Sequence, residues 1–324
     1  MKYTKLGNTG LDISALALGC MTYGDPARGT HEWTLPEEQS RPLIKQAVEA
    51  GITFFDTANS YSAGTSEEFV GRALADYTNR DEIVVATKVY FPSREGQNKG
   101  GLSRKVIMTE IDASLKRLGM EYIDLYQIHR WDPLTPIEET LEALNDVVRA
   151  GKARYIGASS MMAWQFSKAL HLQKANGWAR FVSMQDQYSL IQREDEREMH
   201  PLCADEKIGL LPWSPLARGK LTRDWAESTK RMETDLVTQR IYPMEENDRV
   251  VADVVAEIAT ERGIPRAQVA LAWVSQNPLV SAPIVGASKP GHLDDAVASL
   301  EIELSPAEIA RLEAPYLPHP LTGF

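Results

Sequence analysis

The sequence predicts an α/β protein of the (β/α)8 TIM-barrel class. Short runs rich in β-branched residues alternate with longer segments of helical apolar spacing, which is the pattern of parallel strands joined by helices. Eight such runs fit within 324 residues, a usual length for a barrel with insertions. We expect the strands at residues 13–20, 52–58, 82–89, 122–129, 153–159, 181–187, 209–214 and 282–287.

Two segments fall outside the strand–helix alternation. Residues 2–14, KYTKLGNTGLDIS, contain two short alternating runs around an Asn-Thr-Gly turn, which predicts an N-terminal β-hairpin across one barrel end. Residues 219–246 have no strand pattern and predict a long loop after the seventh strand, suited to a lid or a cofactor strap. With no repeat and no low-complexity linker, we expect residues 1–324 to form a single barrel domain.

Composition excludes several classes of function. The formal net charge is −10 and no run of Lys or Arg resembles a phosphate-binding stripe, which argues against nucleic acid as a partner. Cys20 and Cys203 lie far apart and outside any C-x-x-C pattern, which argues against disulfides and a metal site. The start of the chain lacks a signal-peptide pattern, and no apolar stretch approaches the ~20 residues that cross a membrane. We therefore expect a cytoplasmic protein.

Four polar residues follow consecutive predicted strands. Asp56, Lys88 and His129 stand at the carboxyl ends of the second, third and fourth strands, and Tyr61 comes five residues after Asp56. The carboxyl ends of barrel strands form the face where active sites lie. Each residue by itself is more often structural: a turn Asp, a Tyr at the core rim, a surface Lys. Their joint placement favours a functional site.

This group of residues suits the reduction of a carbonyl. Such a reaction needs a hydride at carbon and a proton at oxygen, where negative charge develops. A tyrosine can give the proton, although its ordinary pKa near 10 is high for the task. The ammonium of Lys88 would favour the phenolate of Tyr61, with Asp56 holding that ammonium charged and oriented. His129 could hydrogen-bond the carbonyl oxygen or share in relaying the proton.

Several fragments together resemble a known family. FFDTANSY, ATK, DLYQIHRWD, YIGASS, WSPLARGKL and IVGASK, in this order and at strand–helix spacing, resemble the aldo-keto reductase superfamily along essentially the whole chain. Within it, LGCMTYGD, the HRWD segment and WSPLARG resemble the bacterial YajO-type reductases and, more distantly, the aryl-alcohol dehydrogenases and the potassium channel β subunits. The resemblance implies that Asp56, Tyr61, Lys88 and His129 are a catalytic tetrad, with Tyr61 as general acid in reduction and general base in oxidation.

The resemblance also implies a nicotinamide cofactor, NADPH or NADP+, bound across the barrel mouth without a Rossmann domain. The chain agrees, because no predicted strand is followed by G-x-G-x-x-G. By motif, the nicotinamide would contact Ser159, Ser160, Gln185 and Trp213. The pyrophosphate would contact Ser214, Leu216 and Arg218. The adenosine 2′-phosphate would be surrounded by Gly286, Ser288, Lys289 and His292, with Asp295 at the adenine amino group.

Three positions depart from the family pattern. Ser160 stands where Asn or Arg is frequent, His292 where Gln or Arg is frequent, and Ala296 where Asn often contacts adenine. The last two leave fewer fixed donors and acceptors around the adenosine end. We therefore expect NADPH to be preferred over NADH without strong discrimination.

The substrate is expected to be a small-molecule carbonyl or alcohol. Tyr23 and Trp131 lie on loops that should wall the pocket, with Trp33 or Tyr90 as further candidates, which suggests aryl or sugar-derived carbonyls. The sequence leaves the substrate's identity, the physiological direction and the oligomeric state open.

Two other functions compete with carbonyl reduction. One is a regulatory cofactor-binding module of the channel β subunit kind, against which the complete tetrad and the lack of an N-terminal inactivation-type extension argue. The other is a barrel lyase in which Lys88 forms a Schiff base. Such a lysine needs a lowered pKa, whereas Asp56 nearby predicts a charged one.

Overall fold

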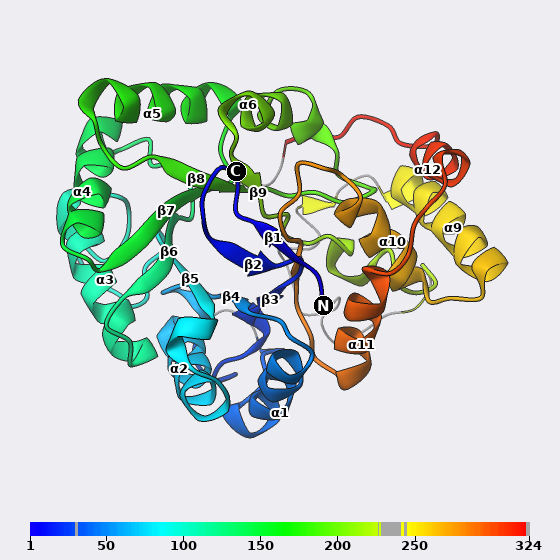
Figure 1. The fold of residues 1–324 in the computed structure, drawn as a ribbon, viewed down its shortest axis with the longest axis horizontal. Coiled ribbons are helices and arrows are strands. Elements are labelled where there is room, and N and C mark those ends of the chain that lie inside the picture. Colours follow the sequence, from blue (N-terminus) through cyan, green and yellow to red (C-terminus); the bar gives the residue numbers. More distant parts are fainter. Residues whose placement is uncertain (30–31, 226, 228–240, 243–244, 322–324) are drawn as a thin grey trace.

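Eight parallel strands form the central sheet of the structure, a computed structural model that describes residues 1–29, 32–225, 227, 241–242 and 245–321 (Figure 1). In these residues the strand order is β10-β3-β4-β5-β6-β7-β8-β9. The strands are β3 (Ala17–Gly19), β4 (Phe54–Asp56), β5 (Val84–Val89), β6 (Ile123–Ile128), β7 (Ala153–Ser159), β8 (Phe181–Gln185), β9 (Gly209–Leu210) and β10 (Ile284–Val285). Neighbours in this order are parallel throughout.

The two ends of this sheet meet and close it. Parallel bridges join Leu210 to Val280 and Trp213 to Ile284, and the backbone N–H of Ile284 donates to the carbonyl of Pro212 at 2.8 Å. Closure removes the open edges that would otherwise expose unpaired backbone groups. The predicted (β/α)8 barrel is confirmed.

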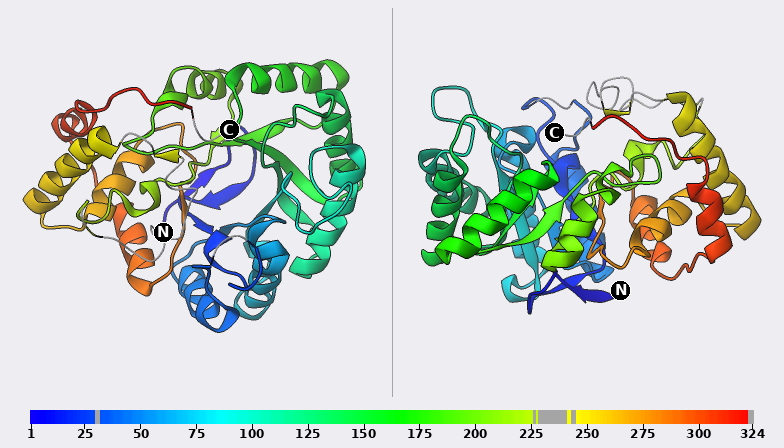
Figure 2. Two further views of the ribbon diagram at one scale, coloured as in Figure 1. Left: turned by 180° about the vertical axis from the view of Figure 1, so that it is seen from behind. Right: turned by 90° about the horizontal axis from the view of Figure 1, so that it is seen from above.

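Helices surround the barrel (Figures 1 and 2). They are α1 (Glu37–Glu49), α2 (Thr65–Tyr77), α3 (Arg104–Leu118), α4 (Ile137–Arg149), α5 (Ala163–Asn176), α6 (Met199–Glu206), α9 (Glu245–Arg262), α10 (Arg266–Ser275), α11 (Pro290–Ser299) and α12 (Pro306–Glu313). Strands β5 and β6 are buried at every position, because the helices cover their outer face and the barrel interior covers the other.

The predicted N-terminal hairpin is present and closes one end of the barrel (Figure 2). Strands β1 (Tyr3–Lys5) and β2 (Asp12–Ser14) pair antiparallel. Leu6 and Ile13 are fully buried in a cluster with Phe54 and Leu125 of the barrel strands. The hairpin therefore covers the amino ends of the strands and leaves their carboxyl ends clear.

Seven of the eight predicted strands are longer than the observed ones, since only the run 153–159 keeps its predicted bounds, and three of them differ strongly. The run 13–20 is split, because β2 ends at Ser14, whose hydroxyl donates to the carbonyl of Leu16 at 2.6 Å, and β3 begins only at Ala17. The run 209–214 keeps only β9, since Pro212 lacks an N–H and Ser214 has a left-handed φ of 54°. The run 282–287 keeps only β10. Apolar runs alone did not reveal these turns.

The predicted long loop is only partly described. A 3-10 turn, η5 (Ala217–Gly219), follows β9, and α9 begins at Glu245. Residues 226, 228–240 and 243–244 between them lie outside the described residues, and so does most of the expected lid or strap.

The described residues contain no helix with both the length and the apolarity needed to cross a bilayer. In the same part of the chain, no group of three or more His, Cys, Asp or Glu side chains is placed to hold a metal ion. Cys20 and Cys203 are both buried as free thiols.

Helices α2 and α3 pack in close contact at Gly71. A Cβ added at this position would overlap the backbone carbonyl of Leu118. Only a residue without a side chain allows these two helices to pack at this distance, and both of them carry loops of the barrel mouth.

We expect Gly71→Ala to lower the free energy of unfolding by about 1–3 kcal/mol, because the methyl group forces the two helices apart. Urea denaturation measures the change. Gly10→Ala is the matched control, since its Cβ would meet no atom within 4 Å. Equal stability of the two variants would contradict the close packing of α2 on α3.

Candidate active site

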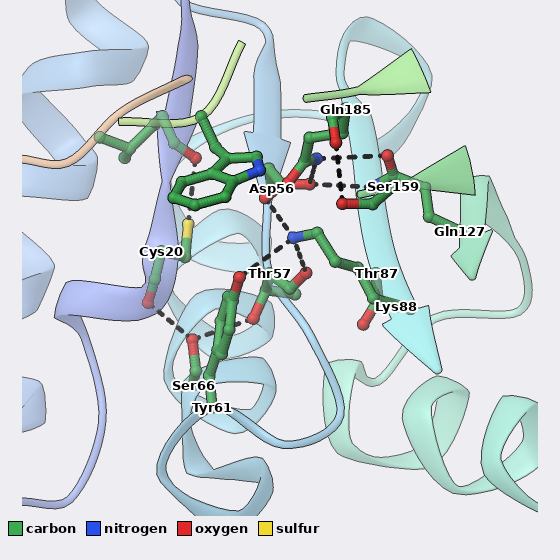
Figure 3. A network of polar contacts seen from close by, with 12 residues as sticks. Cys20, Asp56, Thr57, Tyr61, Ser66, Thr87, Lys88, Gln127, Ser159 and Gln185 are labelled. Atoms are coloured by element: carbon green, nitrogen blue, oxygen red, sulfur yellow. Dashed lines mark hydrogen bonds and ion pairs between the residues drawn. The ribbon is translucent and has the colours of Figure 1, made fainter. Parts of the chain in front are cut away.

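Three of the four predicted catalytic residues are in direct contact at the carboxyl ends of neighbouring strands (Figure 3). Asp56 is the last residue of β4 and Lys88 lies near the end of β5. Tyr61 opens a short turn, η2 (Tyr61–Gly64), before α2, and His129 directly follows β6. Parallel pairing of β4, β5 and β6 places these positions side by side at one end of the barrel.

Lys88 is the centre of this group. Its side chain is 0% exposed, and Nζ donates to Asp56 Oδ2 at 2.5 Å, to the carbonyl of Thr57 at 3.0 Å and to Tyr61 Oη at 3.2 Å. Burial by itself would lower the pKa of Lys88, but the charge of Asp56 and the Tyr61 oxygen outweigh it and raise that pKa. The side chain is therefore an ammonium at neutral pH.

Asp56 is held by more than the lysine. Its Oδ1 accepts hydrogen bonds from Gln127 Nε2 and from Gln185 Nε2, each at 3.0 Å. Gln127 was not predicted from the sequence. It precedes His129 by two residues on β6, so the alternation of a strand places both on the inner face and could have identified it.

The phenol of Tyr61 is protonated at neutral pH. Burial raises the pKa of Tyr61, and the nearby ammonium of Lys88 lowers it by a smaller amount, so the pKa stays above its ordinary value. The sequence correctly predicted the direction of the Lys88 contribution. It did not predict the larger opposing effect of burial, which only the packed structure decides.

His129 is a neutral imidazole beside the phenol. Its ring centroid lies 5.8 Å from that of Tyr61 and 5.0 Å from that of Phe91, with both pairs edge to face. Burial, followed by the charges of Lys88 and Arg130, lowers the pKa of His129 well below its usual range. Its buried Nδ1 has no hydrogen-bond partner among the described residues.

The residues expected at the nicotinamide lie together and adjoin Asp56. Ser159 Oγ donates to the carbonyl of Gln185 at 2.9 Å, and the N–H of Ser160 donates to the same carbonyl at 3.1 Å. Trp213 Nε1 donates to Ser160 Oγ at 3.1 Å. Since Gln185 also bonds Asp56, these side chains form one polar wall with the tetrad.

The residues expected at the pyrophosphate follow β9 in an unusual backbone conformation. Ser214, Ala217 and Arg218 have left-handed φ values of 54°, 48° and 55°, and Leu216 has a φ of −100° and a ψ of 15°. A right-handed residue followed by a left-handed one turns successive N–H groups toward one concave side, which suits an anion. Two N–H groups of this turn are already used within it, because Ala217 donates to the carbonyl of Ser214 at 2.8 Å and Gly219 donates to that of Leu216 at 2.9 Å.

The residues expected at the adenosine end gather at the start of α11. Gly286, Ser288, Lys289 and His292 are exposed, and the N–H of Ser288 bonds His292 Nδ1 at 3.3 Å. Although His292 lies at the surface, its ring is partly covered by protein, and this partial burial together with the charges of Lys289 and Arg223 lowers its pKa against the opposing effect of Asp295. Arg223, which was not predicted, thus adds a positive charge here.

Asp295 has a partner within the protein. Its Oδ1 accepts a hydrogen bond from Gln268 Nε2 at 2.8 Å. The carboxylate is thereby oriented from α10.

Tyr23 and Trp131, the two residues predicted to line the substrate pocket, differ in exposure. Tyr23 is 0% exposed and packs within the core cluster between the barrel and its helices, so it offers no surface to a substrate in this conformation. Trp131 is half-buried, with its ring centroid 6.1 Å from that of the exposed Trp164. Phe91, also absent from the prediction, is partly exposed beside His129. One aromatic side chain, Phe91, therefore packs directly against a predicted catalytic residue, and Tyr23 is covered by protein.

Comparison with known proteins identifies the family. Residues 15–316 match the model of the Aldo/keto reductase family. The chain belongs to this family. It is 48% identical to the versiconal hemiacetal acetate reductase of Aspergillus parasiticus, with 98% of each chain covered. It is 44% identical to a Schizosaccharomyces pombe protein named as an aryl-alcohol dehydrogenase (99% and 97% covered) and 41% identical to an aldo-keto reductase of Fusarium vanettenii (99% and 92% covered).

The chain is thus an aldo-keto reductase enzyme, a class that uses nicotinamide cofactors and acts on small carbonyl compounds. The predicted superfamily is confirmed. The arrangement of the four predicted catalytic residues can be tested through the buried ion pair between Lys88 and Asp56.

We expect Lys88→Met to lower the free energy of unfolding by about 3–5 kcal/mol, because it leaves the buried carboxylate of Asp56 without its cation. The double variant Asp56→Asn/Lys88→Met should recover part of this loss, since neither charge then remains. Urea denaturation of both variants is the measurement. A double variant less stable than Lys88→Met would show that the two charges do not depend on each other.

Proposed function

We propose that this aldo-keto reductase interconverts an aldehyde or ketone with its alcohol, using NADP(H) and Tyr61 as general acid and base. The observation that carries the proposal is the contact of Lys88 Nζ with Tyr61 Oη at 3.2 Å while the same ammonium is bound to Asp56. A buried phenol beside a fixed cation can release a proton because the resulting phenolate is stabilised in place.

Each tetrad residue has one task in this proposal. When bound, the nicotinamide supplies or accepts the hydride at the substrate carbon. Tyr61 Oη gives its proton to the carbonyl oxygen, and the ammonium of Lys88 stabilises the phenolate that remains. Asp56 holds that ammonium, and the neutral ring of His129 can hydrogen-bond the substrate oxygen without competing as an acid.

In the oxidative direction the same groups act in reverse. The phenolate of Tyr61 accepts the proton of the alcohol, and Lys88 again balances its charge. The raised pKa of Tyr61 keeps the phenol mostly protonated at neutral pH, so it can act as the acid in reduction, whereas oxidation requires it to lose that proton first.

The residues present fit a nicotinamide dinucleotide. Ser159, Ser160, Gln185 and Trp213 provide hydrogen-bonding groups and an indole face next to the tetrad. The left-handed turn that includes Ser214, Leu216 and Arg218 suits the pyrophosphate. The residues expected at the adenosine end lie near Arg223, and the positive charges of Lys289 and Arg223 favour NADPH over NADH. They are Gly286, Ser288, Lys289, His292 and Asp295.

Aromatic side chains support an aryl carbonyl or aryl alcohol as substrate. Phe91 lies against His129, and Trp131 continues the aromatic border toward Trp164. The name aryl-alcohol dehydrogenase, carried by a relative 44% identical, agrees with this substrate class. The raised pKa of Lys88 argues against the Schiff-base lyase, which requires a neutral amine.

We expect Tyr61→Phe to lower kcat for NADPH-dependent carbonyl reduction by about 10²-fold or more, because one hydroxyl supplies the proton. The decrease in NADPH absorbance over aryl and aliphatic aldehydes measures kcat, and fluorescence titration should give an unchanged Kd for NADPH.

Tyr126→Phe is the control for this variant. Tyr126 is a fully buried tyrosine on β6 whose Oη has no partner among the described residues, and it packs outside the barrel. We expect removal of the Tyr126 hydroxyl to leave kcat unchanged. Full activity of Tyr61→Phe, or an equal loss in both variants, would refute the assigned role.

We expect Lys289→Met to raise the Kd for NADPH by about tenfold and to affect NADH much less, because only NADPH carries a 2′-phosphate for this cation to contact. Lys289→Arg keeps the charge and should keep most of the affinity. Fluorescence titration with both cofactors is the measurement, and equal weakening of both would contradict a 2′-phosphate site at Lys289.

A further inference from the structure

A second ion network lies directly behind the tetrad, on the outer face of β5. Successive residues of a strand point to opposite faces, so Lys88 faces the barrel interior while Thr87 faces the helices. Thr87 Oγ1 donates to Glu67 Oε1 of α2 at 2.5 Å, and Arg117 Nε of α3 donates to Glu67 Oε2 at 2.5 Å. Figure 3 shows Lys88 reaching Asp56 from this same strand.

Glu110 is the second carboxylate of this network. It lies on α3 and is 2% exposed. Its Oε2 accepts hydrogen bonds from Asn59 Nδ2 at 2.9 Å and from Ser93 Oγ at 3.2 Å, and Arg117 Nη2 lies 3.8 Å from the same oxygen. Glu110 thus connects the loop after β4 with the loop after β5.

The turn that carries Tyr61 has a strained backbone. Ser62, Ala63 and Gly64 have successive φ values of 46°, 52° and 91°, and a left-handed conformation is costly for the two residues that carry a side chain. A Cβ at Gly64 would lie 2.7 Å from Cδ of Arg117, so the arginine packs directly against this turn. Such a turn persists only where its surroundings hold it.

Asn59 also connects this ion network with the segment that carries Lys88 and Phe91. Besides Glu110, its Nδ2 donates to the carbonyl of Phe91 at 3.1 Å, and the Phe91 ring packs against His129. The N–H of Asn59 donates to the carbonyl of Lys88 at 3.2 Å. Asn59 therefore links the segment that carries Tyr61 to the segment that carries Lys88 and Phe91, and His129 is reached only through the Phe91 ring.

We propose that Glu110, held by Arg117 and acting through Asn59, is a positioning residue that fixes the phenol of Tyr61 against Lys88. This inference rests on the proposed function. Buried ion pairs contribute little net stability relative to apolar side chains of similar volume, so stability alone gives no strong reason for this network. Precise placement of a catalytic group is a stronger reason for the network, because displacing such a group by about 1 Å can lower a rate by about 10²-fold.

The test compares Glu110→Leu with Glu110→Gln. Leucine removes the acceptor for Asn59, whereas glutamine keeps a carbonyl oxygen of nearly the same reach. We expect Glu110→Leu to lower kcat about tenfold or more with an unchanged Kd for NADPH, and Glu110→Gln to restore most of kcat. Independently of activity, amide hydrogen exchange of residues 57–66 should be faster in Glu110→Leu than in the wild type and should stay at the wild-type rate in Glu110→Gln.

Asp124→Leu is the matched control. Asp124 is also a buried carboxylate beside β5, where it pairs with Arg80 at 2.6 Å and accepts the N–H of Val85 at 2.9 Å, but it lies toward the amino end of the barrel. We expect it to lower the melting temperature without changing kcat or exchange in residues 57–66. If Glu110→Leu does not fold, Asn59→Ala is tested in its place, because it removes the hydrogen bond between Asn59 and Glu110 and leaves the ion pairs of Glu110 intact.

The outcomes separate this inference from the proposed function. An active wild type whose kcat and hydrogen exchange are unaffected by Glu110→Leu or Asn59→Ala would overturn the positioning role alone. An equal loss of kcat in Asp124→Leu, or no recovery in Glu110→Gln, would overturn it as well. A wild type without NADPH-dependent carbonyl reduction would instead refute the proposed function, while hydrogen exchange would still report whether Glu110 fixes the turn.

Discussion

The ion pair between Lys88 and Asp56 is the interaction on which the site depends. Both side chains are buried, so each charge would be costly without the other. The lysine uses its remaining hydrogen-bonding capacity on the carbonyl of Thr57 and the phenol of Tyr61. The pair therefore joins β5 to β4 and the turn that follows β4, and it sets the charge that the phenol faces.

Hydrogen bonds from the surrounding strands offset the cost of burying this ion pair. Two glutamines from β6 and β8 satisfy the second oxygen of Asp56, so the carboxylate has partners from three further strands besides its own. Burial also separates the protonation states of neighbouring groups: it raises the pKa of Tyr61 and lowers that of His129. The result is one acid that holds its proton and one neutral ring beside it.

Strand alternation gives β5 two roles. Lys88 faces the barrel interior and the tetrad, while Thr87 faces helices α2 and α3 and their buried ion network. The turn that begins at Tyr61 lies between the two networks and has three left-handed residues in succession. Close packing of α2 on α3 at Gly71 supports this arrangement from outside the barrel.

The sequence by itself determined the barrel, the hairpin and which four polar residues gather at one barrel end, because strand periodicity and strand order fix which residues reach one end of a parallel sheet. The tertiary structure decided which groups actually touch. It placed Gln127 on Asp56, added Phe91 beside His129 and Arg223 near His292, and buried the side chain of Tyr23 completely. It also decided the net pKa of Tyr61, since burial and long-range contacts depend on packing that local sequence patterns do not contain.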